Sequence, residues 1–180
     1  DRYYTFSHGQ CDFFVMDVRA ERFEEDDRDP CEKNSMISGG QMNRLDEWIA
    51  QGSDRKFVVS PVPLFPDARG LVGAGSRRDH WTQFPSQRRT LMSILANAAI
   101  DRGKSVFVLS GDVHCSFTAA VDYTRLSDGK TTTLYNIVSS ALHWPIIGLR
   151  YRDFELNASR QMLWGLDRTN EQMDVFTLSN

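Results

Sequence analysis

Residues 105–116 read SVFVLSGDVHCS, a short apolar run that leads directly into a glycine, a carboxylate and an imidazole. A continuous apolar run of this length is typical of a strand whose two faces are both covered, as in the sheets of α/β proteins. Gly111 permits a sharp turn at the end of the run. Because binding sites in layered α/β folds collect at the carboxyl ends of strands, this segment predicts the position of a site as well as a strand.

The sequence on either side of this run predicts the other elements of the same layered fold. Apolar or alternating stretches predict strands, and apolar residues at helical spacing predict two helices. The expected strands cover residues 10–18, 56–60, 105–109 and 173–178, with a hairpin of 117–126 and 131–138 around the turn at 127–130, and the expected helices run from Ser38 to about Gly52 and from about Pro85 to Gly103. This order predicts one α/β domain with an antiparallel end.

The composition is that of an ordinary globular chain. Its 180 residues are 41% hydrophobic and 25% charged, which predicts one domain. The formal net charge of -3, without a basic face, carries no nucleic-acid-binding signature. No run of about 18 apolar residues is present, so no membrane span is expected. Three cysteines without a CxxC pair predict neither a disulfide framework nor a zinc ribbon.

Asp112 and His114 are the side chains in the central segment that could bind a metal. If the segment stays extended, both point to the same side, with Cα atoms roughly 6.5–7 Å apart. They could then converge on one ion, or on two ions about 3.5–4 Å apart, and a carboxylate beside an imidazole suits zinc, manganese or iron. The alternative is an aspartate that caps the turn and a histidine hydrogen-bonded to it, and these residues alone do not decide between the two.

Six segments, taken together and in order, resemble the PhoD-like (alkaline phosphatase D) family. The GDVH loop within LSGDVHCS at 109–116 is the closest match, and the resemblance extends over about residues 1 to 178. The other matching segments are DRYYTFSHGQCDFFVMDVRAER at 1–22, in which an aromatic strand ends in an Asp-x-Arg, GQMNRLDEWI at 40–49, VSPVPL at 59–64, DHWTQFPSQRRTL at 79–91 and NIVSS at 136–140.

The resemblance implies a metallophosphoesterase-like four-layer αββα sandwich, of which this chain would form the C-terminal portion only. It implies hydrolysis of phosphate mono- or diesters by a metal-activated hydroxide. Asp112 and His114 are carried over as metal-site residues, and His114 also as a catalytic residue that either binds a metal or contacts the phosphate. Asp79 and Trp81 are carried over as substrate-binding residues at the rim of the site. The implied cofactors are divalent or trivalent ions in a two-metal-type site, with zinc, manganese, iron and calcium not distinguished.

The departures from the family are as informative as the matches. The family's upstream metal loops have no counterpart here and would precede Asp1. A two-metal site needs roughly five or six protein ligands, and the GDVH loop supplies two. We therefore expect residues 1–180 to be the C-terminal part of a PhoD-like metallophosphatase domain that requires the upstream part of the same chain for activity.

Two other functions fit the same residues. A non-catalytic interaction domain could retain the phosphatase scaffold without its chemistry. A serine or cysteine hydrolase is the weaker alternative, because the sequence lacks a G-x-S-x-G elbow and because Cys115 would point away from His114 in an extended segment. The natural substrate, the metal, the compartment and the oligomeric state are left open by the sequence.

Overall fold

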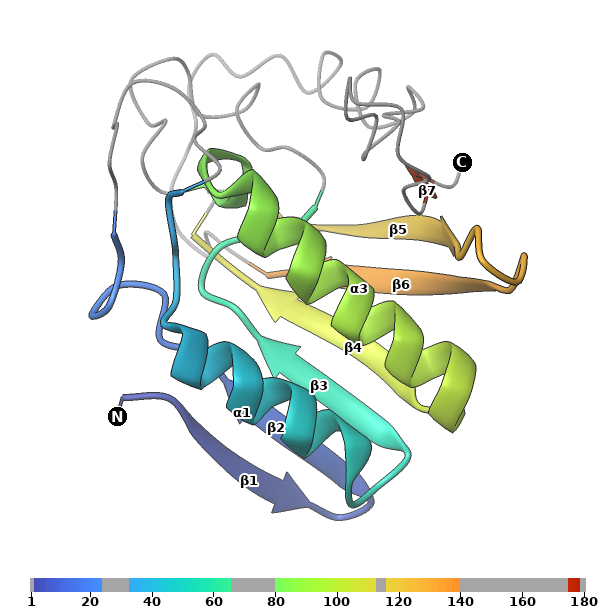
Figure 1. Ribbon diagram of the computed structural model, residues 1–180. Helices are drawn as coiled ribbons and strands as arrows, with labels where there is room; N and C mark the ends of the chain where they lie inside the picture. Colours follow the sequence, from blue (N-terminus) through green and yellow to red (C-terminus); the bar gives the residue numbers. More distant parts are fainter. Residues whose placement is uncertain (1, 24–32, 66–79, 113–115, 140–174, 179–180) are drawn as a thin grey trace.

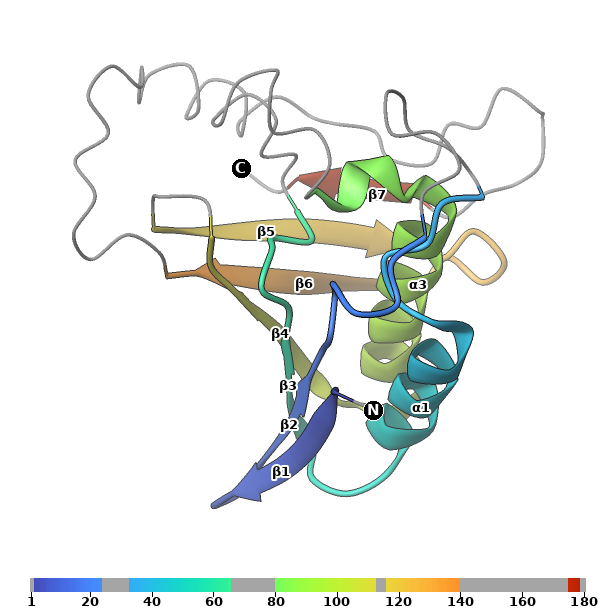
Figure 2. The ribbon, with the colours of Figure 1, turned by 90° about the vertical axis from the view of Figure 1, so that its left-hand side faces the viewer.

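The structure is a computed structural model that describes residues 2–23, 33–65, 80–112, 116–139 and 175–178. These residues form a seven-stranded sheet in the order β1-β2-β3-β4-β6-β5-β7. The strands are β1 (Tyr4–His8), β2 (Cys11–Val15), β3 (Arg55–Val59), β4 (Ser105–Ser110), β5 (Phe117–Thr124), β6 (Thr131–Val138) and β7 (Val175–Leu178), and the helices are α1 (Gly39–Ala50), the short 3-10 helix η2 (Trp81–Gln83) and α3 (Pro85–Arg102). Helices α1 and α3 cover one face of the sheet (Figures 1 and 2).

Four neighbouring strands of the sheet run in the same direction. Strands β2, β3, β4 and β6 pair in parallel, so their carboxyl ends lie at one edge. Strands β1, β5 and β7 pair antiparallel to their neighbours. The α/β fold and the antiparallel end are therefore confirmed, whereas the edge strand β1 was missed. All five residues of β1 are exposed, and its antiparallel pairing with β2 identifies it as a strand.

Both long helices begin and end where their cap residues predict. The Ser38 hydroxyl accepts a hydrogen bond from the Gln41 backbone N–H at the start of α1. Helix α3 begins at Pro85, because the backbone N–H that proline lacks would have no hydrogen-bond partner within the helix at that position. It ends at Gly103, whose φ of 63° is costly for other residues. Residues on one side of each helix pack against the sheet to form the core: Met42, Leu45, Ile49, Leu91, Met92 and Leu95 with Phe14, Val58, Val106 and Val108.

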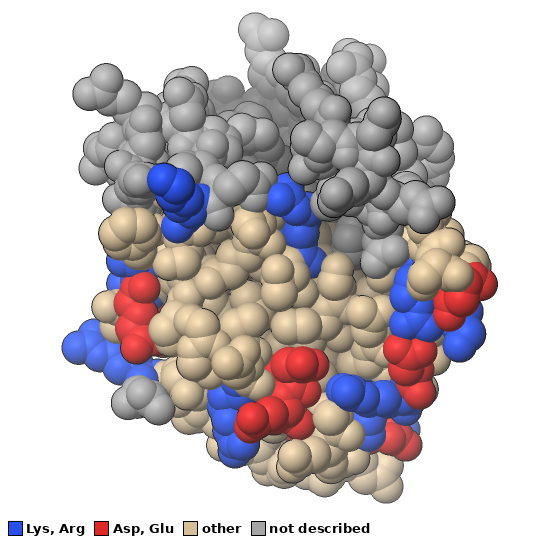
Figure 3. Space-filling model, viewed as in Figure 1, with Lys and Arg blue, Asp and Glu red and all other residues tan. Residues whose placement is uncertain are grey.

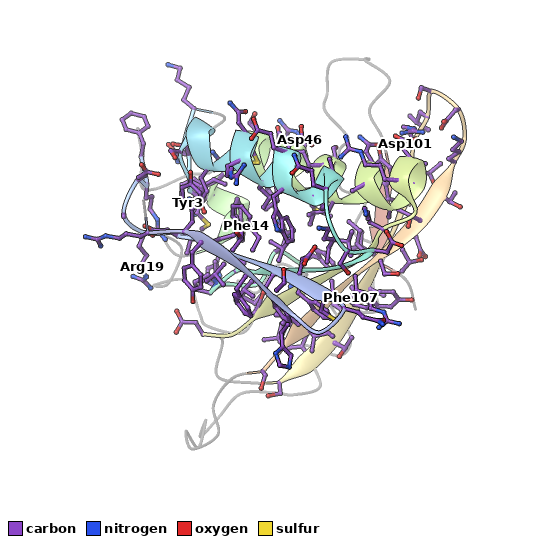
Figure 4. The ribbon with its side chains drawn as sticks, turned by 90° about the horizontal axis from the view of Figure 1, so that it is seen from below. Tyr3, Phe14, Arg19, Asp46, Asp101 and Phe107 are labelled. Carbon is purple, nitrogen blue, oxygen red and sulfur yellow. The ribbon has the colours of Figure 1, made fainter. Side chains whose placement is uncertain are left out.

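The opposite face of the sheet carries a row of stacked rings, which we call the aromatic ladder: Phe6, Phe13, Phe57, Phe107 and Tyr135. Each ring lies opposite the next on an adjacent strand, with centroids 4.6, 5.0, 5.3 and 6.0 Å apart. Figure 4 shows Phe14 between sheet and helices and Phe107 on the other side. Phe6 is 45% exposed and Tyr135 40% exposed, so the ladder is only partly covered.

A buried ion pair lies at the end of the sheet where the parallel strands begin, opposite their carboxyl ends. Lys56 of β3 is fully buried, and its Nζ donates to Asp12 Oδ2 at 2.8 Å, to Trp48 O at 3.5 Å and to Gln51 O. The Lys56 ammonium also lies 4.5 Å from the centre of the Trp48 ring. Hydrogen bonds from Lys56 and then from the Ser7 hydroxyl lower the pKa of Asp12 to about 2. Lys56 therefore ties the last turn of α1 to strands β2 and β3.

Charged side chains on the helix face do not gather by sign. Figure 3 shows basic and acidic side chains of the described residues interspersed around a largely uncharged centre. Within the part of the chain that the structure describes, no helix is both long enough and apolar enough to cross a membrane.

Candidate functional site at the carboxyl ends of the parallel strands

The edge where the four parallel strands end remains hydrogen-bonded beyond the strands themselves. The Ser60 N–H donates to Leu109 O at 2.9 Å, the Gly111 N–H to Pro61 O at 3.2 Å, and the Ser139 N–H to Ser110 O at 2.9 Å. Gly111 packs closely here, because a Cβ added to it would lie 3.4 Å from Ser139 O. The segments that leave β3, β4 and β6 are therefore held side by side, as predicted for a site in this class of fold.

Asp112 turns the chain off β4 in an uncommon conformation. Its φ is 59°, and among the described residues no other non-glycine residue has a positive φ. Left-handed backbone in a non-glycine residue is costly and is found preferentially at functional sites. The condition that the segment stays extended does not hold at Asp112, so strand alternation no longer predicts the directions of the residues that follow. His114, Cys115 and Asp79 lie outside the described residues.

Arg19 lies beside Asp112, although the two residues follow different strands. Its Nη2 is 3.7 Å from Asp112 Oδ2, and the two side chains are 64% and 54% exposed. Figure 4 shows Arg19 at the end of the molecule away from Asp101, which lies near the end of α3. Half-exposed ion pairs at this distance contribute little to stability. The pair therefore marks where the loops after β2 and β4 meet, without being needed to hold them together.

The loop that carries Arg19 is held by two other side chains. Asp17 Oδ1 accepts hydrogen bonds from the backbone N–H groups of Arg19 and Ala20, both at 3.0 Å. Those bonds, that from Ala20 first, lower the pKa of Asp17. Gln41 is fully buried in the first turn of α1, where its amide accepts from the Asp17 N–H and donates to Asp17 O, both at 2.9 Å. Sequence reasoning did not place Arg19 or Gln41 at this edge, although the Asp-x-Arg after an aromatic strand was a usable signal.

The turn after β3 rests on a buried polar network. The Trp81 indole N–H donates to Ser60 Oγ at 3.1 Å, and the Ser60 hydroxyl donates to Val62 O at 2.6 Å. The Arg88 guanidinium donates to Leu64 O, with the Nε bond at 2.7 Å, and the Asn136 amide donates to Phe65 O at 2.6 Å. Residues from three separate segments that carry the family resemblance thus converge on one turn, which also accepts the Gly111 N–H.

Trp81 is completely buried in this network. Its indole N–H is used in the hydrogen bond to Ser60, which begins the turn after β3. Substrate binding by Trp81 stays a prediction, and in this structure the buried ring supports the turn through its hydrogen bond to Ser60.

Replacing Trp81 with phenylalanine is expected to lower the free energy of unfolding by about 1–2 kcal/mol, because Ser60 loses a buried donor and the smaller ring leaves space unfilled. Urea unfolding of the variant, beside the control Tyr135→Phe, measures this effect. Tyr135 is 40% exposed, so its change should leave stability within about 0.5 kcal/mol. Equal stabilities of Trp81→Phe and the wild type would contradict the supporting role.

The described residues do not complete a metal site by themselves. Among them, no group of three or more histidine, cysteine, aspartate and glutamate side chains is close enough together to hold an ion. At the strand edge, the carboxylate of Asp17 is occupied by its own loop, and Asp112 offers a hard oxygen donor. Asp112 thus fits the chemistry of a metal ligand, and the other ligands of such a site would come from residues beyond those described.

Comparison with known proteins identifies the family of the chain. The family model described as PhoD-like phosphatase matches residues 1–175. A solved structure titled "Structure of PhoD" matches with a TM-score of 0.56 and 17% sequence identity, over 78% of this chain and 29% of that chain. At this identity the likeness shows the fold, and the chain spans less than a third of that protein. No curated protein matches the chain. By the family match over nearly its whole length, the chain belongs to the PhoD-like phosphatase family.

Proposed function

We propose that residues 1–180 form the C-terminal part of a metal-dependent phosphoester hydrolase that acts on phosphate mono- or diesters. The observation that carries the proposal is Asp112, a half-exposed carboxylate in the left-handed conformation at the end of β4, in the loop that matches the family most closely. When bound, two metal ions would supply an activated hydroxide and neutralise charge on the phosphoryl oxygens.

Each proposed site residue has a distinct part in that chemistry. Asp112 would offset the charge of a cation with its carboxylate. His114 would either bind a metal through a neutral ring nitrogen or contact the phosphate as an imidazolium. Asp79 would lie at the rim of the substrate site, and Trp81 would act there through the turn that begins at Ser60. The metal identity among zinc, manganese, iron and calcium is left open by these donors.

Two observations support a requirement for the upstream part of the chain. The match covers only 29% of the solved PhoD chain. The aromatic ladder is partly exposed on the sheet face opposite the helices, where an αββα sandwich places its second sheet. A second sheet packed on the ladder would bring its own loops near the edge where Asp112 lies, and these loops would provide the missing ligands.

Metal analysis and phosphoester assays on the complete protein test the proposal. The complete protein is expected to bind metal, to hydrolyse p-nitrophenyl phosphate or bis(p-nitrophenyl) phosphate, and to lose this activity on chelation. Residues 1–180 alone are expected to be slower by roughly 10³-fold or more, since they lack most of the ligands.

The opposite results separate the alternatives. Full metal occupancy and normal rates in residues 1–180 alone would refute the requirement for upstream residues. A folded complete protein that hydrolyses neither ester with any of the four metals would refute the hydrolase. The aromatic ladder would then favour a non-catalytic interaction domain on the same scaffold.

A further inference from the structure

Arg19 lies beside the carboxylate of Asp112, to which the proposed function assigns a metal. Strand β3 lies between β2 and β4, so the loops that follow β2 and β4 have to meet across the end of β3. They do so through the side chains of Arg19 and Asp112, with 3.7 Å between Nη2 and Oδ2. A cationic side chain thus lies next to the carboxylate that the proposed function assigns to a metal, and both are open to solvent on the same edge.

The structure holds the backbone of Arg19 more firmly than a solvated surface residue requires. Asp17 fixes the N–H groups of Arg19 and Ala20, and Gln41 fixes the N–H and C=O of Asp17. Gln41 has no exposed surface, so a buried amide holds a loop in which the Arg19 side chain is 64% exposed. Pre-organisation of this kind is what a binding site needs, because a long side chain on a fixed backbone loses less freedom when it binds.

The chemistry of the guanidinium selects the ligand. Its planar array of N–H donors matches two oxygens of a phosphoryl group, and it stays charged at any working pH. The contact with Asp112 is half-exposed, so an anionic phosphoryl oxygen that approaches this edge can replace it at small cost. A carboxylate that binds a cation and a neighbouring arginine that binds the anion together form a suitable pair for a phosphoester.

From these contacts we propose that Arg19 binds a phosphoryl oxygen of the substrate, and that Asp17 and Gln41 are positioning residues that hold its loop. This inference rests on the proposed function and names the residue that recognises the phosphoryl group. Neither the sequence resemblance nor the family match assigned a role to Arg19.

The test uses Arg19→Ala and Arg19→Lys in the complete, metal-loaded protein. Two quantities are measured: the dissociation constant of inorganic phosphate by calorimetry, and kcat and KM for p-nitrophenyl phosphate. Arg19→Ala is expected to weaken phosphate binding by about tenfold to a hundredfold, as for loss of a charged hydrogen-bonded partner. Arg19→Lys is expected to lie between, because it keeps the charge and loses the planar fork.

Arg44→Ala is the matched control. Arg44 is 54% exposed on α1 and pairs with Glu47 on the same helix at 3.4 Å, so its loss should change neither phosphate binding nor kinetics. The positioning role is tested by a double-mutant cycle with Gln41→Met. Gln41→Met is expected to weaken phosphate binding in the wild type and to have little further effect in Arg19→Ala, which a purely structural role would not produce.

The outcomes distinguish the inference from the function on which it rests. A folded wild-type protein without phosphoesterase activity would refute the proposed function. If the wild type is active, and neither Arg19 variant changes the phosphate dissociation constant or the KM by as much as twofold, the proposed role of Arg19 is wrong. Thermal melting of each variant without phosphate shows whether it is folded. If Arg19→Ala is not folded, Arg19→Lys tests the role of Arg19.

Discussion

Asp112→Asn is expected to lower kcat/KM of the complete protein by about 10²- to 10³-fold, while its melting temperature changes by no more than about 2 °C. Asparagine has nearly the same shape and also adopts the left-handed conformation, so the φ of 59° is tolerated. The neutral amide, however, no longer offsets the charge of a bound cation. Steady-state kinetics with p-nitrophenyl phosphate, together with metal content by mass spectrometry, measure the effect.

Asp112→Gly separates the effect of the left-handed backbone at this position from the effect of the carboxylate. Glycine adopts positive φ without steric cost, so this variant is expected to be as stable as the wild type or more stable by up to about 1 kcal/mol. Its kcat/KM is expected to fall at least as far as that of Asp112→Asn, because the carboxylate is gone. Asp122→Asn is the matched control, since Asp122 is an exposed carboxylate of β5 that accepts a hydrogen bond from the Thr133 hydroxyl at 2.7 Å. Wild-type activity in Asp112→Asn would remove the observation on which the hydrolase proposal depends.

Lys56→Ala is expected to lower the free energy of unfolding by about 3–5 kcal/mol, the usual cost of removing one partner of a buried ion pair. The ammonium of Lys56 donates to Asp12 and to the Trp48 and Gln51 carbonyls at the end of α1, and all three lose this donor together. Asp12 keeps its hydrogen bonds from the Ser7 hydroxyl and the Ser53 N–H, but it loses its charged partner. Urea unfolding followed by circular dichroism measures the loss. Lys130→Ala, which changes a side chain that is 57% exposed, should cost less than about 0.5 kcal/mol.

The same pair predicts a dependence of stability on pH. Because the folded pKa of Asp12 is lowered from 3.8 to about 2, its contribution is fully present above about pH 4 and is lost as the pH falls toward 2. In Lys56→Ala the main cause of the lowered pKa is gone, so the difference in stability between wild type and variant should shrink across that interval. A difference that stays constant from pH 5 to pH 2 would mean that Asp12 and Lys56 are not coupled as the structure indicates.

Several features of the fold could be predicted from neighbouring residues because their causes are local. Ser38 and Gly103 mark a helix start and a helix end through backbone hydrogen bonding and a left-handed cap, and each acts within one turn. The apolar run at 105–109 predicted strand β4 for the same reason, although among the described residues helices cover only one of its two faces. Strand β1 escaped detection because an exposed edge strand is recognised by its pairing, and pairing is a long-range property.

The sequence predicted where the candidate site lies but not which residues meet there. The GDVH loop pointed to the end of β4, and the structure keeps Asp112 there. The partner Arg19 lies 93 positions earlier in the chain, and it reaches Asp112 only because β2, β3 and β4 are neighbours in parallel. Trp81 was placed at the rim by its motif, and only the packed structure showed that its ring is buried beneath the turn at Ser60.

The sequence by itself determined the α/β class, the two long helices, most of the strands and the loop that carries Asp112, since caps, turns and apolar periodicity act over a few residues. Only the tertiary structure decided that β6 rather than β5 pairs with β4, that five rings stack across the sheet, and that Arg19 meets Asp112. These depend on strand order, which places residues distant in sequence side by side to bury the largest apolar surface. No local pattern contains that information.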